Sequence, residues 1–351
     1  MKAVILSAGY GTRLKPLTDF VPKPLVKVLG ISIIEYTLAF MKRNDIKDVY
    51  INRHHHPELF EGLSIPSGLN VHFSHEKDIL GTLGGLLGFK EHLLDDETLV
   101  VNGDIIFNFD LKQLYHFHRS KKNISTMVLK NKDSNNVSSV FVDDFNNVVS
   151  IGKSAEGIYS EYMFSGIQII TPELFEKVES KNPPSCIVRD FYIPYMKEGG
   201  RISGFIADGN FLWKELGDLS GYLNTNLAIL DLLSRYKLDH QTESFISDYW
   251  FNVRGDKIIE SVEGIWLGDG YYIDHSATII PPVLIGSNSK VMANCVVGPM
   301  AVIGDNVIID HDSQIRESVV LDGTHIQNNN LVEKMVISKD FVFNSLKGSE
   351  N

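Results

Sequence analysis

The first thirty residues of the chain concentrate groups that suit phosphate chemistry. Gly9 and Gly11 stand just after an apolar run, where glycines let backbone N–H groups approach phosphate oxygens closely. Arg13 follows this glycine loop, and Lys23 stands ten residues later between two prolines. A planar guanidinium and a compact ammonium near one loop favour binding of a polyphosphate that leaves during a reaction.

The charge balance narrows the class of partner. Residues 1–30 carry five Lys or Arg and one Asp, a local net charge of +4, whereas the whole chain has a formal net charge of −11. A protein wrapped along nucleic acid needs a net basic face, so we expect no nucleic-acid partner but leave a nucleotide open. No apolar stretch reaches spanning length, and we expect no membrane partner.

The two cysteines, Cys186 and Cys295, are far apart and form no paired motif, which argues against a disulfide framework or a zinc site. The amino-terminal apolar run is too short for a signal peptide. We therefore expect a cytoplasmic protein.

These chemical groups need elements to position them. Short apolar segments at 2–7, 48–52, 70–74 and 98–102 alternate with helical patterns around 31–43, 81–93 and 110–119. This alternation predicts βαβ units and a mostly parallel, helix-covered sheet, with a hairpin at 138–151 and a long helix near 218–234. Asp104 comes just after the strand at 98–102, at the sheet edge where ligands bind, and we expect it to bind Mg²⁺.

The pattern changes after about residue 270. Aliphatic residues recur every six positions from Ile273 to Leu321: Ile273, Ile279, Ile285, Val291, Val297, Ile303, Ile309, Ile315 and Leu321. A triangular coil produces this period, with one short strand on each side and the aliphatic residue pointing inward. Nine hexads predict a left-handed parallel β-helix of about three coils. The predicted organisation is a catalytic domain at 1–235, a connector at 236–264, the β-helix at 265–339 and a tail at 340–351.

The string GYGTRLKPLT (residues 9–18), followed by PKPL (22–25), resembles the signature of the sugar-1-phosphate nucleotidyltransferases. The resemblance continues through ILGTLGG (79–85), VNGD (101–104), YMFSGIQII (162–170) and the tryptophan segment 213–218, and many members carry such a β-helix. It implies an α/β domain of the Rossmann-like glycosyltransferase-A type that transfers a nucleotidyl group from an NTP to a sugar 1-phosphate and releases pyrophosphate.

The resemblance also implies roles for particular residues. Arg13 and Lys23 are expected to be catalytic, and Asp104 and Glu215 to bind Mg²⁺. The expected nucleotide contacts are Ala8, Gly9, Gly11, Thr12, Glu76, Gly81, Thr82 and Gly103, and the expected sugar-phosphate contacts are Lys153, Glu161, Ser165 and Gly166.

The second metal carboxylate departs from the family pattern Trp-x-Asp-x-Gly-Thr. Glu215 takes the place of the aspartate and is longer by one methylene, and Asp218 replaces the threonine. Asp218 either caps the helix that follows or adds a second carboxylate.

The resemblance is nearest to mannose-1-phosphate guanylyltransferase-like proteins and favours GTP and mannose 1-phosphate. Uridylyl or thymidylyl transfer to another sugar phosphate, and a non-catalytic regulatory paralogue, are the alternatives. Acyl transfer on the β-helix, with His275, His311 or His325 as base, is disfavoured because no long loop interrupts the hexads. Stacked coils favour pairing between subunits, so we expect a homo-oligomer formed through the β-helix.

Overall fold

The computed structural model describes residues 1–132, 138–153, 157, 159–178, 183–207, 211–235 and 259–346. Most of the predicted connector (236–258) and the end of the predicted tail (347–351) lie outside these residues. Contacts divide the chain into two compact units. The first comprises Met1–Tyr10, Pro22–Pro24 and Thr37–Trp213, and the second comprises Gly11–Val21, Leu25–Tyr36 and Lys214–Asn351. The domain boundaries predicted from the sequence, at residues 235, 264 and 339, stay a prediction.

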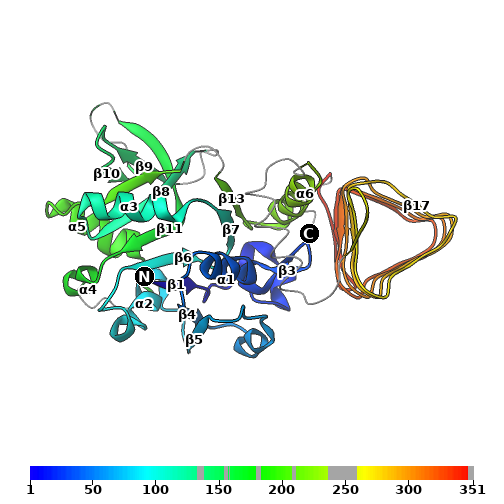
Figure 1. Ribbon diagram of the computed structural model, residues 1–351, viewed down its shortest axis with the longest axis horizontal. Helices are drawn as coiled ribbons and strands as arrows, with labels where there is room; N and C mark the ends of the chain where they lie inside the picture. The colour runs from blue at the N-terminus through cyan, green and yellow to red at the C-terminus, as the bar shows by residue number, and fades with distance from the viewer. Residues whose placement is uncertain are drawn as a thin grey trace. The chain divides into compact units, whose positions relative to one another are not determined.

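The first unit is built on a nine-stranded mixed sheet (Figure 1). Its strands are β1 (Lys2–Leu6), β4 (Asp48–Arg53), β5 (Asn70–His75), β6 (Thr98–Asn102), β8 (Ser125–Asn131), β9 (Ser139–Val142), β10 (Val148–Ile151), β11 (Ser160–Ile170) and β12 (Ser203–Ile206). The strands β6, β1, β4 and β5 run parallel in that order, and β11 joins β6 antiparallel. Ala3, Val4 and Ile5 are fully buried, as expected for a central strand covered on both faces. The predicted mostly parallel α/β fold is confirmed.

Short helices cover the sheet: α2 (Gly81–Leu87), α3 (Leu111–Lys121), α4 (Glu173–Lys177), a π-helix (Ile187–Tyr192) and α5 (Ile193–Lys197), while α1 (Ile33–Arg43) spans both units. The Asp110 carboxylate caps α3 by accepting hydrogen bonds from two backbone N–H groups of its first turn. The predicted helix 81–93 is shorter than expected, because α2 ends at Leu87 and only a 3₁₀ turn, Lys90–His92, follows.

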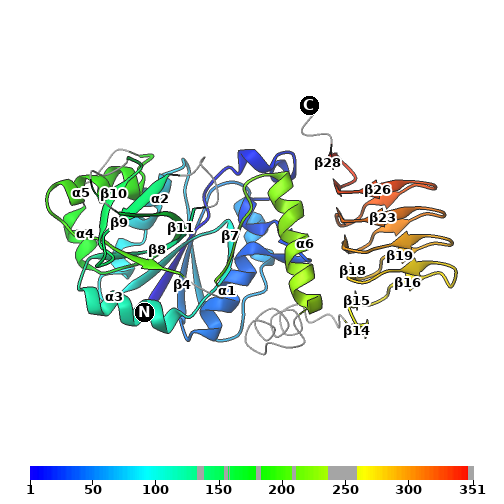
Figure 2. The same ribbon diagram turned by 90° about the horizontal axis from the view of Figure 1, so that it is seen from above.

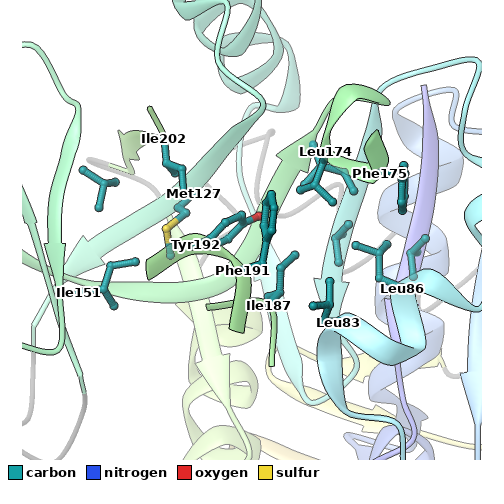
Figure 3. Close-up of a cluster of buried hydrophobic side chains, with 14 of the residues drawn as sticks. Leu83, Leu86, Met127, Ile151, Leu174, Phe175, Ile187, Phe191, Tyr192 and Ile202 are labelled. Carbon is teal, nitrogen blue, oxygen red and sulfur yellow. The ribbon is translucent and has the colours of Figure 1, made fainter. Parts of the chain in front are cut away.

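One apolar cluster joins these helices to the sheet. Leu83 and Leu86 from α2 and Phe191 and Tyr192 from the π-helix are among its buried members (Figure 3). Burial raises the pKa of Tyr192 far above its ordinary value, and its hydroxyl donates to Gln168 Oε1 at 2.6 Å. The π-helix is thereby fixed to the middle of the sheet, beside the strands that end at the pocket described below.

The second unit contains the β-helix, whose triangular section and stacked coils appear in Figures 1 and 2. Its first sheet contains β14 (Ile259–Val262), β15 (Ile265–Leu267), β18 (Val283–Ile285), β21 (Ala301–Ile303), β24 (Ser318–Val320), β27 (Met335–Ile337) and β28 (Val342–Asn344). The second contains β16 (Tyr272–Ile273), β19 (Lys290–Val291), β22 (Ile308–Ile309) and β25 (His325–Ile326), and the third contains β17 (Thr278–Ile279), β20 (Val296–Val297), β23 (Gln314–Arg316) and β26 (Leu331–Glu333). The predicted parallel β-helix is confirmed as a fold.

The β-helix is longer than predicted, and its register shifts near its end. The second and third sheets each have four strands, so the prism has four coils rather than about three. Ile303 pairs with Val320, 17 residues on, whereas Ile285 pairs with Ile303, 18 residues on. The corner before β24 is therefore one residue shorter. The prediction that Leu321 points inward is wrong, because Val320 is buried in that place.

The rest of the second unit comes from both ends of the chain. It contains 3₁₀ turns at Thr12–Leu14 and Leu17–Asp19, a two-stranded hairpin made of β2 (Lys27–Val28) and β3 (Ile31–Ser32), and α6 (Leu219–Arg235). Strand β13 (Leu212–Glu215) carries the chain from the first unit into the second. None of the described helices is both long and apolar enough to cross a membrane.

Candidate active site

A pocket at the carboxyl edge of the parallel strands gathers seven of the sixteen predicted site residues. It has a volume of about 220 Å³ and lies where β1, β4 and β6 end, the edge at which open α/β sheets bind ligands. All of its lining residues belong to the first unit: Leu6, Ser7, Ala8, Gly9, Lys23, Pro24, Asn52, Ile79, Gly81, Thr82, Asn102, Gly103 and Asp104. The predicted residues that meet there are Ala8, Gly9, Lys23, Gly81, Thr82, Gly103 and Asp104.

Two glycines let backbone segments close around this pocket. Gly103 donates its N–H to the Leu6 carbonyl at 2.9 Å, and a Cβ on Gly103 would lie 2.7 Å from Ser7 Oγ. Gly81 has φ +77° at the start of α2, and a Cβ there would lie 2.4 Å from the Ser185 carbonyl oxygen. By contrast, a Cβ on Gly9 would meet nothing within 4 Å, so its side toward the pocket is open. Gly9 therefore leaves room for a ligand, whereas the other two permit close backbone packing.

Lys23 brings a positive charge into the pocket wall. Its Nζ lies 2.6 Å from Asp104 Oδ2, and the two side chains are 10% and 27% exposed. Lys23 opens the 3₁₀ turn Lys23–Leu25 between two prolines, which fix the backbone on both sides. The structure thus places the predicted catalytic lysine and the predicted metal aspartate side by side at the end of β6.

Glu76, which the resemblance implies as a nucleotide contact, is not among the residues that line the pocket. Glu76 is 5% exposed, and both of its carboxylate oxygens accept hydrogen bonds: Oε1 from Asn52 Nδ2 at 2.7 Å and Oε2 from the Leu80 N–H at 2.9 Å. Asn52 in turn accepts from the Ser7 N–H at 2.7 Å through its Oδ1. Glu76 therefore ties the entrance of α2 to β4 and to the glycine loop.

Sequence reasoning missed Asn52, which lines the pocket from the end of β4. The signal was available, because Asn52 is a polar residue at the carboxyl end of an otherwise apolar predicted strand. Without the fold, that position did not stand out among the other polar strand ends.

Thr82 faces the pocket but its side-chain oxygen already has a partner. Thr82 Oγ1 accepts a hydrogen bond from the Ile187 N–H at 2.9 Å, and the Leu83 N–H donates to the Ser185 carbonyl at 3.0 Å. The segment that leads into the π-helix is thereby fastened to the first turn of α2. Thr82 thus lines the pocket while its hydroxyl oxygen anchors the segment before the π-helix.

Arg13, Thr12, Gly11 and Glu215 belong to the second unit. Arg13 is 70% exposed, and its NH2 lies 3.3 Å from Glu215 Oε1. Gly11 has φ +63°, and its carbonyl accepts a hydrogen bond from Thr18 Oγ1 at 2.9 Å, which closes the loop on itself. Thr12 is exposed. The structure therefore brings the predicted catalytic arginine next to one predicted metal carboxylate.

The predicted sugar-phosphate residues are not gathered in the pocket. The Ser165 hydroxyl is buried and donates to the Val128 carbonyl at 2.7 Å, and Gly166 has φ +81° against Asn102. Glu161 accepts from Lys132 Nζ at 2.8 Å, and hydrogen bonds from Lys132 and Ser139 hold the pKa of its carboxyl below the ordinary value. Lys153 is exposed on the bend after β10.

The two predicted metal carboxylates have the chemistry that Mg²⁺ needs. Among the described residues, Asp104 Oδ1 and Glu215 Oε2 have no hydrogen-bond partner, and hard carboxylate oxygens supplemented by substrate oxygens suit this ion. Asp218 caps α6, because its Oδ1 accepts from the Gly221 N–H at 2.7 Å, which is the first of the two roles expected for this residue. No three His, Cys, Asp or Glu side chains form a ready-made metal cluster in the part of the chain that the structure describes.

Comparison with known proteins decides the family. The Nucleotidyl transferase family model matches residues 2–231, more than half of the chain. The chain belongs to this nucleotidyl transferase family. A second family model, the GMPPB C-terminal domain, matches residues 279–346, which lie within the stacked coils.

Curated members of the nucleotidyl transferase family differ in the nucleotide their names specify. A UTP–glucose-1-phosphate uridylyltransferase of Synechocystis is 26% identical over 89% of this chain and 83% of its own length. A mannose-1-phosphate guanyltransferase of Saccharomyces cerevisiae is 28% identical over 67% of this chain and 66% of its own length. The solved structure of HddC from Yersinia pseudotuberculosis covers 65% of this chain and 99% of that chain, with a TM-score of 0.54 at 20% identity, and supports the fold.

Proposed function

We propose that this nucleotidyl transferase uses GTP and mannose 1-phosphate to make GDP-mannose and pyrophosphate. The observation that carries the nucleotidyl transfer is the Lys23–Asp104 pair beside the glycine loop at the sheet edge, and the choice of GTP and mannose 1-phosphate is supported by the match to the GMPPB C-terminal domain and by the yeast relative. A buried lysine next to a carboxylate suits a triphosphate and its metal ion. The expected cytoplasmic location is part of the proposal.

In the proposed reaction, an oxygen of the sugar phosphate forms a bond to the α-phosphorus of the NTP. The bond between that phosphorus and the bridging oxygen of pyrophosphate breaks, and the electron pair leaves with pyrophosphate. Backbone N–H groups of Ala8 and Gly9 would cradle the phosphates, with Gly11 and Thr12 continuing the loop. Lys23 would hold the phosphate at the reacting centre, and Arg13 would neutralise charge that develops on pyrophosphate.

The proposal assigns Mg²⁺ binding to Asp104 and Glu215. The ion would supply charge neutralisation for the triphosphate. In the free protein Lys23 and Arg13 contact these carboxylates, so each cation already sits beside a group that would hold the metal. Lys23 and Arg13 would then turn from the carboxylates to phosphate oxygens.

The nucleobase and the sugar would be selected by the remaining predicted residues. Gly81, Thr82 and Gly103 line the pocket and would contact the nucleotide, while Glu76 would act by holding Asn52 and the start of α2. For the sugar phosphate we keep Lys153, Glu161, Ser165 and Gly166. Ser165 would contribute through its backbone, since its hydroxyl is engaged with Val128.

A panel of ATP, CTP, GTP, UTP and dTTP against mannose, glucose and N-acetylglucosamine 1-phosphates, followed by pyrophosphate release, tests the proposal. We expect the highest kcat/KM for GTP with mannose 1-phosphate. Lys23→Ala should lower kcat by about 100-fold or more, because a positioned cation is lost at the developing charge. Lys112→Ala, which removes an exposed lysine from α3, serves as the matched control and should be unchanged.

Each outcome of this panel has a distinct meaning. Preference for UTP or dTTP would replace the proposed substrates by the uridylyl or thymidylyl alternative, and the name of the Synechocystis relative specifies UTP. Absence of pyrophosphate release with every pair would favour the regulatory paralogue. Normal turnover of folded Lys23→Ala would reject the phosphate role of Lys23.

We also propose that the chain forms a homo-oligomer through the β-helix. The observation that supports this is that three apolar side chains of the β-helix are exposed, Tyr272 and Ile308 on its second sheet and Leu331 on its third. Exposed apolar side chains on stacked coils favour pairing between identical subunits.

A further inference from the structure

The turn of the β2–β3 hairpin is held by buried side chains of α6. The Tyr222 hydroxyl donates to the Lys27 carbonyl at 2.9 Å, and Asn226 Oδ1 accepts from the Leu29 N–H at 2.9 Å. Tyr222 and Asn226 are 2% and 1% exposed and lie four residues apart on one face of the helix. We call Tyr222 and Asn226 the hairpin clamp.

The hairpin clamp is internally fixed as well. Asn226 Nδ2 donates to the Tyr222 carbonyl at 2.9 Å, so the Asn226 amide uses its oxygen for the hairpin and its nitrogen for its own helix. Burial raises the pKa of Tyr222 far above its ordinary value, which keeps its hydroxyl protonated and able to donate. Leu29 has φ +50°, a left-handed conformation that a leucine rarely adopts without outside support. The clamp supplies that support.

The same helix and the same hairpin also contact the β-helix. Helix α6 packs along β21, β24 and β27, and Figure 2 shows it running beside the stacked coils. Lys27 Nζ lies 2.7 Å from Asp322 Oδ2, in the turn that follows β24. Asp322 Oδ1 accepts from the Asp305 N–H at 2.9 Å, which ties two successive coils together. A carboxylate that joins two coils thus also reaches the hairpin.

The amino end of α6 leads directly to predicted catalytic groups. Asp218 caps the helix, Leu216 before it is fully buried, and Glu215 pairs with Arg13. These residues, the hairpin, α6 and the β-helix all belong to the second unit. A shift of α6 on the coils would therefore move Glu215.

We propose that Tyr222 and Asn226, supported by the Lys27–Asp322 ion pair, are positioning residues that hold Arg13 and Glu215 in place for the triphosphate and its metal ion. The proposal rests on the proposed function for the roles of Arg13 and Glu215. In this proposal the β-helix supports the phosphate-binding groups mechanically, in addition to any part it has in assembly. The ligand that Arg13 and Glu215 would bind is the NTP with its Mg²⁺, and the proposal does not extend to the sugar phosphate.

The two kinds of contact differ in weight. The Lys27 and Asp322 side chains are 49% and 43% exposed, and pairs exposed to this extent contribute little. The bond from Tyr222 is buried, and its loss would leave the Lys27 carbonyl without that donor in an environment where unpaired groups are costly. Removal of the Tyr222 hydroxyl should therefore have the larger effect.

The test compares Tyr222→Phe and Asp322→Asn with two controls in the full chain. Tyr192→Phe removes an equally buried tyrosine hydroxyl from the first unit, and Glu333→Gln breaks the Arg316–Glu333 pair between neighbouring coils. Hydrogen exchange is followed in peptides that cover residues 11–21 and 214–226. Pyrophosphate release gives KM for NTP, the half-saturating Mg²⁺ concentration and KM for sugar 1-phosphate.

Tyr222→Phe should speed exchange in both peptides by about fivefold, the equivalent of one net hydrogen bond, with a smaller effect for Asp322→Asn. KM for NTP and the Mg²⁺ requirement should rise together, while KM for sugar 1-phosphate and both controls stay unchanged. Unaltered exchange in the folded Tyr222→Phe variant overturns the proposal. If Tyr222→Phe speeds exchange but the wild-type protein releases no pyrophosphate with any substrate pair, the positioning inference stands and the proposed function is rejected. Equal kinetic changes in Tyr192→Phe would show a general loss of stability and also overturn it.

Discussion

At the scale of single residues, the charges of the site are arranged in opposite pairs. Lys23 faces Asp104 in the first unit, and Arg13 faces Glu215 in the second. A hydrogen bond to a carboxylate holds the orientation of a cationic side chain until a competing anion arrives. Under the proposed function, a ligand that brings both phosphate and a divalent metal ion would offer a new partner to each member of these pairs.

Glu215 provides a direct test of the metal role. Glu215→Ala should raise the half-saturating Mg²⁺ concentration by about tenfold or more, because a charged ligand is lost. Glu215→Asp should keep or improve Mg²⁺-dependent turnover, since it restores the carboxylate of the usual family pattern. An Mg²⁺ titration of pyrophosphate release for both variants measures this effect. Asp218→Asn is the control, and a titration of Glu215→Ala that matches the wild type would contradict the assignment.

From residue types alone, the residues that line the pocket could be predicted better than the hydrogen bonds that support them. Glycine loops and Lys23 stand out in the sequence because few structural roles require them at that spacing. Glu76 looked equally informative, yet its carboxylate is used by Asn52 and by the Leu80 N–H. Whether a buried acid faces a ligand or a neighbouring strand depends on strand order, which a single sequence does not display.

At the scale of elements, α6 depends on its first turn. The Asp218 carboxylate accepts the Gly221 N–H, and the helix then runs to Arg235 with Tyr222, Leu223, Ile229 and Leu230 buried. The apolar spacing predicted this helix closely, because amphipathic helices carry their signal in every turn. Which of its polar residues would bind the hairpin was beyond prediction, since Tyr222 and Asn226 read as ordinary members of the buried face.

Removal of the α6 cap should weaken the protein without changing its fold. Asp218→Ala should lower the free energy of unfolding by about 1 kcal/mol, because it leaves the Gly221 N–H without its carboxylate partner. Asp218→Ser, which can still cap, is the matched variant and should recover most of the loss. Urea unfolding followed by circular dichroism measures both, and equal stability of the alanine and wild-type proteins would show that the cap contributes nothing.

The β-helix shows where a strict repeat misleads. The six-residue period continues in the sequence to Leu321, but the corner before β24 is one residue shorter and Val320 takes the buried position. Both residues are aliphatic, so the sequence supports either register. The shorter corner depends on how whole coils stack, and the local sequence pattern carries no information about that stacking.

At the scale of the whole molecule, the fold class followed from the sequence, because alternating elements and hexads are repeated signals. The composition of the compact units did not follow. Residues 11–21 and 25–36 group with the carboxyl-terminal part of the chain, and no local pattern in them indicates such distant partners.

The proposed oligomer is testable at this scale. The full chain should sediment as an oligomer at micromolar concentration, and Leu331→Lys or Ile308→Lys should shift it toward the monomer by replacing an exposed apolar side chain with a charge. Phe145→Lys, at an exposed position in the first unit, is the matched control and should leave the mass unchanged. A monomeric wild-type chain in sedimentation equilibrium would refute the proposal.

The contact between Lys27 and Asp322 has a consequence for biosynthesis. These residues are 295 positions apart, so a ribosome that adds 5–20 residues per second needs about 15–60 s to make the second after the first. The β2–β3 hairpin lacks α6 until residues 219–235 have been made, and it lacks the coil that carries Asp322 until the end of that interval. The earliest part of the chain to be made is thus among the last to reach its final packing. A nascent or truncated chain can contain much of the pocket before the loop at residues 11–21, which carries Arg13, reaches its final conformation. Only a fully synthesised chain should therefore turn over substrate at its full rate.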